Sequence, residues 1–440
     1  MRKWVTRVLA ALFCACVLFL CVMTFAPNLR EFGYAVFRRY ANYLPSNATV
    51  FDNISARISA FEDSLGNVFY KKEAFQQLNA SMQYAIGKQM LFFGDSTMVK
   101  LKGGQLYELR EDTELSETVY DLVELNAYCE AQGIPMVFVY AHTSLYGDDK
   151  DLLPVGAIDY NNEAADKALS ILREGGVDVL DSREFLRDYP LEDIIFYTDF
   201  HWTPVAAREA AQQVGAWLNE NGVPADESVL AADAYEKIVE EDIFFGRLGQ
   251  RIGVKNIAPE DFTLLIPEFS SYIKVTHREG EEEEVHEGPF SEAVMRTEDA
   301  MRRNEEGYST NCYYAYGPHA WESEYENDSA PQSRVLVMKD SFGTPVAAFL
   351  SNAVGELLAT DQRKTTLSAE EYVEQYQPDA VVVVVSEETG IISMAKNGVL
   401  IRRLDRQNLF NLLQEELVPP EEKESKKALF WRGKNEKKKD

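Results

Sequence analysis

Apolar positions recur along most of this chain at two spacings, one typical of strands and the other typical of helices. Short apolar runs predict strands at 90–93, 136–140, 177–180, 334–338, 356–360 and 380–385. Apolar residues three and four positions apart predict helices at 112–132, 162–174, 205–219 and 368–376, and one after Gly343. This alternation predicts an α/β fold, in which helices cover both faces of a parallel sheet. The five consecutive valines within 380–385 are typical of a central strand that is buried on both faces.

The alternation stops between residues 223 and 332, which indicates an insertion in the α/β domain. This stretch has few helical periods and many aromatic residues, and it contains the acidic run Glu281–Glu284. We interpret the acidic run as a solvated loop or the tip of a hairpin. A cation site built from the same four carboxylates is the alternative.

The first apolar run differs from all the others, because Val8–Ala26 contains no charged residue. At about 1.5 Å per residue, a helix of this length spans roughly 28 Å, close to the thickness of a bilayer core. We expect an uncleaved signal anchor, and a cleaved signal peptide is the alternative. Flanking basic residues are nearly balanced and leave the orientation open. Because a single N-terminal anchor usually exports the chain beyond it, we expect a single-pass protein of a bacterial cell membrane, with the bulk of the chain outside.

Composition and charge narrow the class of protein further. The chain has 44 Lys and Arg residues against 72 Asp and Glu residues, a formal net charge of −28, so a basic surface for nucleic acid is not expected. Only two of its five cysteines, Cys129 and Cys312, lie outside the first apolar run. This count excludes a disulfide scaffold and a four-cysteine metal site. One disulfide between the two remains an alternative to two buried free thiols, and we predict no metal or cofactor.

These patterns divide the chain into five segments. They are a cytoplasmic tip and transmembrane signal anchor at 1–28, a helical lead-in at 29–88, the α/β domain at 89–390 with its insertion at about 223–332, a C-terminal extension at 391–422, and a basic tail at 423–440 that we expect to be disordered.

A candidate catalytic pair precedes the helix predicted at 205–219. Asp199 and His201 are two positions apart, and in an extended segment such side chains point to the same side. The carboxylate of Asp199 can then orient the imidazole of His201 and stabilise its protonated form. The alternative is that Asp199 caps the following helix and His201 only packs.

Two serines are candidates for a nucleophile. Ser341 comes after the strand at 334–338 and precedes a helix, so its hydroxyl is expected at the carboxyl edge of the sheet, where open α/β sheets hold their sites. The N–H groups of that helix end can stabilise an oxyanion, and an ordinary helix cap is the alternative role of Ser341. Ser96, in Gly94-Asp95-Ser96, resembles the block that opens many SGNH esterases. Against Ser96, the Asp199–His201 pair lies in the middle of the chain and not near its C-terminal end.

The order of these motifs resembles the DHHW group of SGNH-hydrolase-like proteins, which is similar to alginate O-acetyltransferases of the AlgJ/AlgX type. The resemblance covers about residues 50–390 and rests on the segments Leu91–Asp95, Pro135–Val139, Leu145-Tyr146, Asp199–Pro204, Lys339–Gly343, Asp361–Arg363 and Tyr376–Asp379. It implies a circularly permuted SGNH-like fold in which Ser341 is the nucleophile, His201 the base and Asp199 its partner. Ser96 then becomes a turn residue.

Two positions depart from the family pattern. Phe200 replaces the second residue of the Asp-His-His-Trp form, and its side chain is expected to point away from the site. Tyr140-Ala141-His142 stands where relatives often have Pro-x-Lys before the Leu-Tyr pair.

The resemblance also implies a function, namely O-acetylation of a cell-envelope or exopolysaccharide glycan outside the cell, beside a membrane-bound O-acyltransferase that supplies acetyl groups. A carbohydrate or lipid esterase with the same triad is one alternative, and a non-catalytic glycan-binding or assembly protein is another. Aromatic residues near the motifs are candidates for substrate binding, with core packing as the alternative. They are Tyr197, Trp202, Tyr316, His319 and Trp321.

Overall fold

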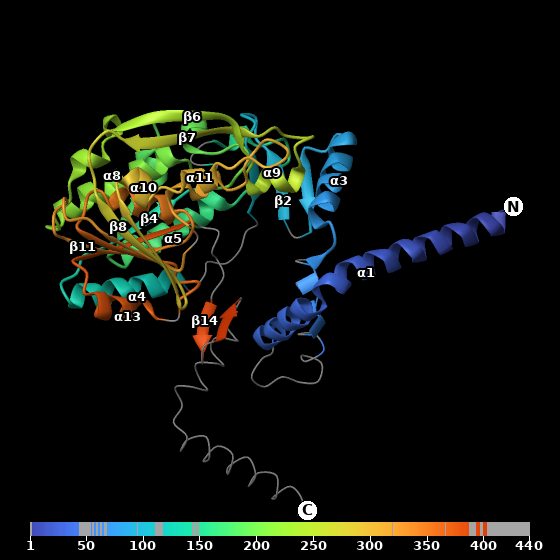
Figure 1. Cartoon of the computed structure of the whole chain (residues 1–440), viewed down its shortest axis with the longest axis horizontal. Helices are drawn as coiled ribbons and strands as arrows, with labels where there is room; N and C mark the ends of the chain where they lie inside the picture. The colour runs from blue at the N-terminus through green and yellow to red at the C-terminus, as the bar shows by residue number, and fades with distance from the viewer. Residues whose placement is uncertain are drawn as a thin grey trace, which may run out of the picture. The chain divides into compact units, whose positions relative to one another are not determined.

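The structure is a computed structural model of the 440-residue chain (Figure 1). It describes residues 2–43, 68–94, 96–110, 118–142, 149–318, 320–365, 367–386, 393–396 and 399–402, with isolated positions at 54, 57–58, 60–61, 64–65 and 145. Contacts within the chain separate it into two compact units. One comprises Met1–Lys72 with Ile391–Asp440, and the other comprises Glu73–Gly390.

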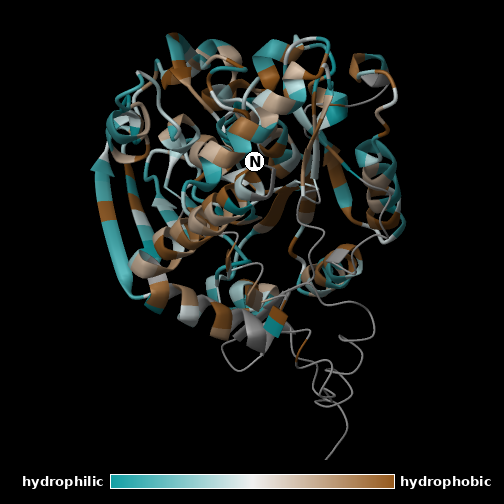
Figure 2. Cartoon of the chain, turned by 90° about the vertical axis from the view of Figure 1, so that its right-hand side faces the viewer, coloured by the Kyte–Doolittle hydropathy of each residue, from teal (hydrophilic) through white to brown (hydrophobic). Residues whose placement is uncertain are grey.

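The first unit contains the long N-terminal helix α1 (Arg2–Tyr43) and a small hairpin of β14 (Ser393–Lys396) and β15 (Val399–Arg402). Within α1, the segment Trp4–Pro27 is long and apolar enough to cross a membrane, and only 6% of its most apolar window is buried. Brown and tan residues predominate along the helix that starts at the label N in Figure 2. The predicted basic tail at 423–440 lies outside the described residues, as does the extension beyond residue 402.

An eight-stranded sheet forms the centre of the second unit. In their order across the sheet, the strands are β5 (Asp178–Asp181), β4 (Met136–Ala141), β13 (Ala380–Ser386), β11 (Arg334–Lys339), β12 (Glu356–Thr360), β10 (Glu322–Glu326), β8 (Ile273–Glu279) and β9 (Glu282–Gly288). The first five strands are parallel, as the sequence predicted. The last three are antiparallel and come from the predicted insertion, so the complete sheet is mixed.

Helices cover both faces of the parallel part, as Figure 1 shows for α8 on one side and for α4 and α13 on the other. One layer contains α8 (Pro204–Glu220) and α12 (Gly343–Leu350), and the opposite layer contains α4 (Thr118–Ala131), α5 (Asn161–Glu174) and α13 (Ala369–Tyr376). Alternate residues of β11 enter the two cores, with Val335 and Val337 on the first side and Leu336 and Met338 on the second. The valine-rich strand β13 lies between β4 and β11 and is buried on both faces, as predicted.

The rest of the second unit is built from smaller elements. A three-stranded antiparallel sheet contains β1 (Met90–Phe93), β2 (Ser96–Lys100) and β3 (Leu106–Leu109). Helix α3 (Lys72–Ala85) packs on this sheet through Ala80 and Leu91, so the compact unit begins before the predicted boundary at 89. The remaining short helices outside the insertion are η1 (Asp149–Leu152), α6 (Ser182–Phe185) and α7 (Leu191–Ile194).

The insertion is mainly a set of hairpins. The strands β6 (Tyr235–Phe244) and β7 (Glu260–Pro267) form an antiparallel pair, visible along the top of the molecule in Figure 1. The acidic run begins in the turn between β8 and β9 and continues into β9, in agreement with its interpretation as a hairpin tip. The insertion also contains short helices, which are η2 (Glu227–Leu230), η3 (Ala232–Ala234), α9 (Arg247–Ile252), α10 (Phe290–Ala293), α11 (Thr297–Ala300) and η4 (Cys312–Tyr316). Cys312, like Cys129, is a buried free thiol.

Candidate active site

Ser341 lies in the tight turn between β11 and α12, at the carboxyl end of the central strands. The preceding residue, Asp340, fixes this turn with both carboxylate oxygens. Its Oδ1 accepts from the N–H of Phe342 at 2.8 Å, and its Oδ2 accepts from the N–H and the hydroxyl of Ser386 on β13, both at 2.7 Å. Gly343 lets α12 begin directly against β11, because an added Cβ would lie only 2.6 Å from the Cβ of Lys339. The position of Ser341 is therefore set by two adjacent strands.

His201 is held near Ser341 by the residues that come directly after it. The indole N–H of Trp202 donates to the carbonyl of Phe342 at 3.1 Å, which joins the two segments next to their functional residues. Thr203 then caps α8 by accepting from the N–H of Ala206 at 3.4 Å, and Pro204 occupies the first position of the helix, where its missing N–H costs nothing. These contacts fix the segment that leads from His201 into α8.

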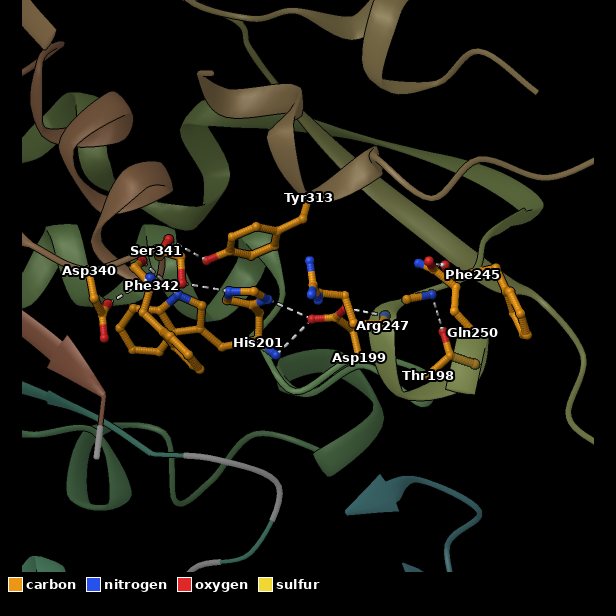
Figure 3. A network of polar contacts seen from close by, with 12 residues as sticks. Thr198, Asp199, His201, Phe245, Arg247, Gln250, Tyr313, Asp340, Ser341 and Phe342 are labelled. Carbon is orange, nitrogen blue, oxygen red and sulfur yellow. Dashed lines mark hydrogen bonds and ion pairs between the residues drawn. The ribbon is translucent and has the colours of Figure 1, made fainter. Parts of the chain in front are cut away.

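The three predicted catalytic residues form one hydrogen-bonded chain (Figure 3). The Nε2 atom of His201 lies 2.8 Å from Oγ of Ser341, and its Nδ1 lies 2.6 Å from Oδ1 of Asp199. Asp199 and His201 are buried, whereas Ser341 is partly exposed. This geometry matches that of a nucleophile, a general base and a carboxylate that orients the base.

Asp199 is held as an ionised carboxylate. Besides the imidazole, its Oδ1 accepts from the N–H of His201 at 3.0 Å, and its Oδ2 accepts from the N–H of Arg247 at 2.8 Å. Burial acts to raise the pKa of Asp199, but attraction to His201 and these hydrogen bonds outweigh it, so the pKa lies below its usual value. An ionised Asp199 favours the protonated imidazole that forms when His201 takes a proton.

Tyr313, in η4 of the insertion, covers the imidazole and also touches the nucleophile segment. Its ring stacks on His201 with the centroids 3.9 Å apart and an interplanar angle of 21°, and its hydroxyl donates to the carbonyl of Ser341 at 3.0 Å (Figure 3). Burial raises the pKa of Tyr313 well above its usual value, so the hydroxyl stays protonated as a donor. Phe200 and Phe342 add ring contacts at 4.1 and 4.8 Å, which shield His201 from water.

Sequence reasoning did not find Tyr313, because no motif marks it among the many aromatic residues of the insertion. Phe200 was expected to point away from the site, but its ring lies against that of His201.

Ser96, the other candidate nucleophile, is in a different environment. It opens β2 in the three-stranded sheet, where its Oγ accepts from Nη2 of Arg251 at 2.6 Å. The catalytic hydrogen-bonded chain ends on Ser341 and does not include Ser96. The neighbouring Asp95 lies outside the described residues.

The aromatic candidates for substrate binding are distributed over several environments. Trp202 and Tyr316 are buried, and the Tyr316 hydroxyl accepts from the N–H of Leu265 at 2.6 Å, so both pack in the core and this corrects their expected binding role. Tyr197 is half-buried and lines a cavity of about 410 Å³, whereas Trp321 is 37% exposed and lines a separate cavity of about 190 Å³. His319 lies outside the described residues.

His142 and the acidic run are two other features that the sequence brought to attention. His142, where relatives often have the lysine of Pro-x-Lys, is buried with its Nδ1 2.7 Å from Oγ of Ser182. Burial lowers the pKa of His142 to about 3, so its imidazole is neutral at physiological pH. Within the described parts of the chain, no three His, Cys, Asp or Glu side chains are grouped closely enough to hold a metal ion, including those of the acidic run.

Comparisons with known proteins agree with this architecture. Residues 101–261 match the family model of the SGNH hydrolase-like domain of the acetyltransferase AlgX, a range that includes Asp199 and His201. The structure of PatB1 from Bacillus cereus has 18% identity and a TM-score of 0.54, and the match covers 67% of this chain and 97% of that one. At this identity the likeness shows a shared fold.

Two other solved structures are more distant. A DHHW family protein from Eubacterium siraeum has 17% identity and a TM-score of 0.49, with 71% of this chain and 96% of that one covered. The O-acetyltransferase domain of Pseudomonas putida AlgJ has 12% identity and a TM-score of 0.39, with 73% and 99% covered. No curated protein sequence matches the chain. The resemblance inferred from the sequence motifs is confirmed, because residues 101–261 are similar to the SGNH hydrolase-like domain of AlgX.

Proposed function

We propose that this chain is an O-acetyltransferase that modifies hydroxyl groups of a cell-envelope or exopolysaccharide glycan outside the cell. The observation that carries the proposal is the hydrogen-bonded chain Ser341–His201–Asp199. Two of its members, Asp199 and His201, lie in the range that matches the AlgX SGNH hydrolase-like domain. The match to the domain of the acetyltransferase AlgX supports the choice of acyl group.

In the first half of the proposed reaction, Ser341 becomes acetylated. Its Oγ attacks the carbonyl carbon of the acetyl donor while Nε2 of His201, 2.8 Å away, takes the hydroxyl proton. The tetrahedral intermediate then collapses, the bond to the donor's leaving group breaks, and His201 returns the proton to that group. Asp199 stabilises the imidazolium between these two proton transfers.

In the second half, a sugar hydroxyl takes the place of the leaving group. His201 removes its proton, the sugar oxygen attacks the acetyl carbon, and the bond to Oγ of Ser341 breaks. Oγ then recovers the proton from His201, so the products are the acetylated sugar and the starting enzyme. Water in place of the sugar would give free acetate, which is the esterase alternative.

The oxyanion formed in both halves needs N–H donors near the Ser341 turn. The N–H of Phe342 is already donated to Asp340, and that of Thr344 to the carbonyl of Ser341 at 3.3 Å. We therefore assign the oxyanion role to the N–H groups of Ser341 and Gly343, at the start of α12.

The cavity beside Trp321 is a candidate site for a sugar ring of the acceptor. The carbonyl of Trp321 accepts from the N–H of Asp361, directly after β12, and β12 is the neighbour of β11. With strands about 4.8 Å apart, Trp321 is roughly 10 Å across the sheet from the end of β11. Its exposed ring can stack on a pyranose, and polar side chains complete the cavity wall. They are Arg278, Glu322, Thr365 and Tyr372.

The N-terminal helix fits an enzyme that works beside a membrane-bound partner. Trp4–Pro27 can anchor the chain in the membrane, with the α/β domain on the outer side. A membrane-bound O-acyltransferase that carries acetyl groups across the membrane is the donor that this arrangement would serve.

The proposal is tested with the purified full-length chain, an activated acetyl ester and a panel of oligosaccharides from cell-envelope glycans. We expect acetylated sugar, detected by mass spectrometry, with the wild type and not with Ser341→Ala. Ser96→Ala is the matched control and should retain the activity. Free acetate as the only product, at a rate that no oligosaccharide changes, would replace transfer by hydrolysis.

A further inference from the structure

Glu260, the first residue of β7, makes an unusual set of contacts beside the catalytic pair. Its Oε1 accepts from the N–H and the hydroxyl of Thr198, at 2.7 and 2.5 Å. Its Oε2 accepts from the N–H of Tyr197 at 2.7 Å. One carboxylate therefore holds two consecutive residues of the segment that ends in Asp199, from a strand about sixty positions further along the chain.

Thr198 also binds the loop at residues 246–249, which in turn binds Asp199. The Thr198 hydroxyl accepts from the N–H of Gly246 at 2.8 Å, and its carbonyl accepts from the N–H of Gly249, also at 2.8 Å. The next residue after Gly246 is Arg247, whose N–H is the partner of Oδ2 of Asp199. Figure 3 shows Thr198, Arg247 and Asp199 grouped at the start of α9.

The approach between this loop and Asp199 is too close for any other residue at position 246. A Cβ added to Gly246 would lie 2.3 Å from Cβ of Asp199 and 2.7 Å from the carbonyl oxygen of Thr198. A displacement of Thr198 therefore moves both the backbone of Asp199 and the donor to its Oδ2.

We propose that Glu260 is a positioning residue of the triad, whose ionised carboxylate holds Asp199, and through it His201, in the geometry that activates Ser341. The inference rests on the proposed function of the triad and goes beyond it, because it assigns part of the catalytic arrangement to the insertion. Three hydrogen-bond donors on its two oxygens favour the ionised form. Protonation of Glu260 would place a hydrogen on one oxygen and weaken the hydrogen bonds that the carboxyl group accepts.

Glu260 is able to change its protonation state near neutral pH. Burial raises its pKa to about 7, against the lowering effect of the hydrogen bonds from Thr198 and Tyr197, and repulsion from Asp199 adds to the rise. The carboxyl group lines the 410 Å³ cavity, through which protons can exchange with solvent. The other titratable or charged groups around it are Glu192 and Asp193 of α7, Tyr197, Asp199, Lys237 of β6, Asp261 of β7 and Cys312 of η4.

The activity should fall at acidic pH, because the ionised form of Glu260 is the active one. Above about pH 7 Glu260 is ionised and its three hydrogen bonds are intact, and the fraction of enzyme with these bonds decreases as the pH falls through this value. Glu260→Gln cannot ionise and resembles the protonated wild type at every pH. The ratio of wild-type to variant activity should therefore be large in alkali and approach one in acid.

The experiment compares kcat of the full-length wild type and Glu260→Gln with a chromogenic acetyl ester, from about pH 5 to about pH 9. We expect the variant to be slower by about tenfold or more above about pH 8, because small misplacements of catalytic groups carry costs of this size. The ratio should fall toward one at acidic pH, and KM should not change. Asp261→Asn, at the next position, is the matched control and should give a ratio near one above about pH 8, where Glu260 is ionised in both proteins.

A second pair of variants covers the case in which Glu260→Gln does not fold, judged by circular dichroism. Thr198→Ser keeps the hydroxyl that links Glu260 to Gly246 and should retain wild-type kcat, whereas Thr198→Ala should be slowed. A constant ratio at all pH values for Glu260→Gln, or equal rates for the two Thr198 variants, would overturn the positioning role. A rate that Ser341→Ala leaves unchanged would instead show that the proposed triad itself is not the catalyst.

Discussion

Each residue of the proposed catalytic triad is held in place by hydrogen bonds from residues outside the triad. Asp340 fixes the turn of Ser341, Trp202 joins that turn to His201, and the N–H of Arg247 fixes Asp199. The result is a serine whose Oγ is already 2.8 Å from its base before any substrate binds. Such preorganisation lets the nucleophile react without a prior rearrangement.

This geometry predicts which serine reacts with a covalent probe. A fluorophosphonate should label Ser341 and not Ser96, because the imidazole of His201 lies at hydrogen-bonding distance from Ser341. His201→Ala should slow labelling by about 10²–10⁴-fold, the usual contribution of general-base assistance. Peptide mapping by mass spectrometry identifies the site. A label on Ser96 would restore the usual SGNH order of motifs and refute our assignment.

The same residues show what could be predicted from the sequence. Asp199, His201 and Ser341 could be singled out as candidates because two short motifs have spacings that fit strand geometry and a strand-to-helix turn, and the structure brings these three residues into contact. Tyr313 and Glu260 were not found, because their contacts with the site arise only when the insertion folds back onto residues 197–201. The burial of the aromatic candidates could not be predicted from the sequence either. Tyr316 lies in the core, whereas Trp321 is exposed.

At the scale of elements, predictions succeeded where periodicity is strong and both faces are buried. The five parallel strands have apolar runs, and the helices that cover them have clear apolar faces. The strands β8, β9 and β10 were missed because they carry many charged residues. Glu282–Glu284 lies in an edge strand, where side chains such as Glu284 are paired with Arg296 and do not need an apolar core. These three strands widen the sheet at the side that carries Trp321.

We expect the acceptor to bind at this edge of the sheet, apart from the triad that handles the acetyl group. Trp321→Ala should raise KM for an oligosaccharide acceptor by about tenfold, since stacking on an aromatic ring contributes roughly 1–2 kcal/mol to binding. It should leave hydrolysis of a small acetyl ester unchanged, because the ring does not touch the triad. The two assays are run side by side, and Tyr272→Ala serves as control, because Tyr272 is an exposed aromatic residue that does not line the cavity. Equal losses in both assays would contradict a role confined to the acceptor.

At the scale of the whole molecule, the chain combines a candidate membrane helix with an acidic α/β unit. The net charge of −28 does not favour binding to nucleic acid, which is consistent with the glycan substrate that we propose. The 24-residue segment Trp4–Pro27 matches the length of a membrane span. The candidate membrane helix lies in the first compact unit, and the proposed catalytic residues lie in the second.

This organisation predicts the response of intact cells to an external protease. Digestion should remove epitopes of the α/β unit while a tag at the N-terminus, on the cytoplasmic side, stays protected. Immunoblotting before and after detergent lysis gives the comparison. Full protection of the α/β unit in intact cells, or a mature protein that begins near residue 27, would contradict the anchored and outward-facing arrangement.

Acetyl transfer by way of Ser341 is tested most directly by following the acetyl group in a single turnover. The full-length chain is mixed with an activated acetyl ester, quenched with acid at short times, and digested for mass spectrometry, with and without an oligosaccharide acceptor. We predict an acetyl group on the peptide that contains Ser341, which disappears faster when the acceptor is present and appears on the sugar at the same rate. An acetyl group on any other serine, or a Ser341 adduct whose decay no acceptor accelerates, would contradict acetyl transfer by this triad.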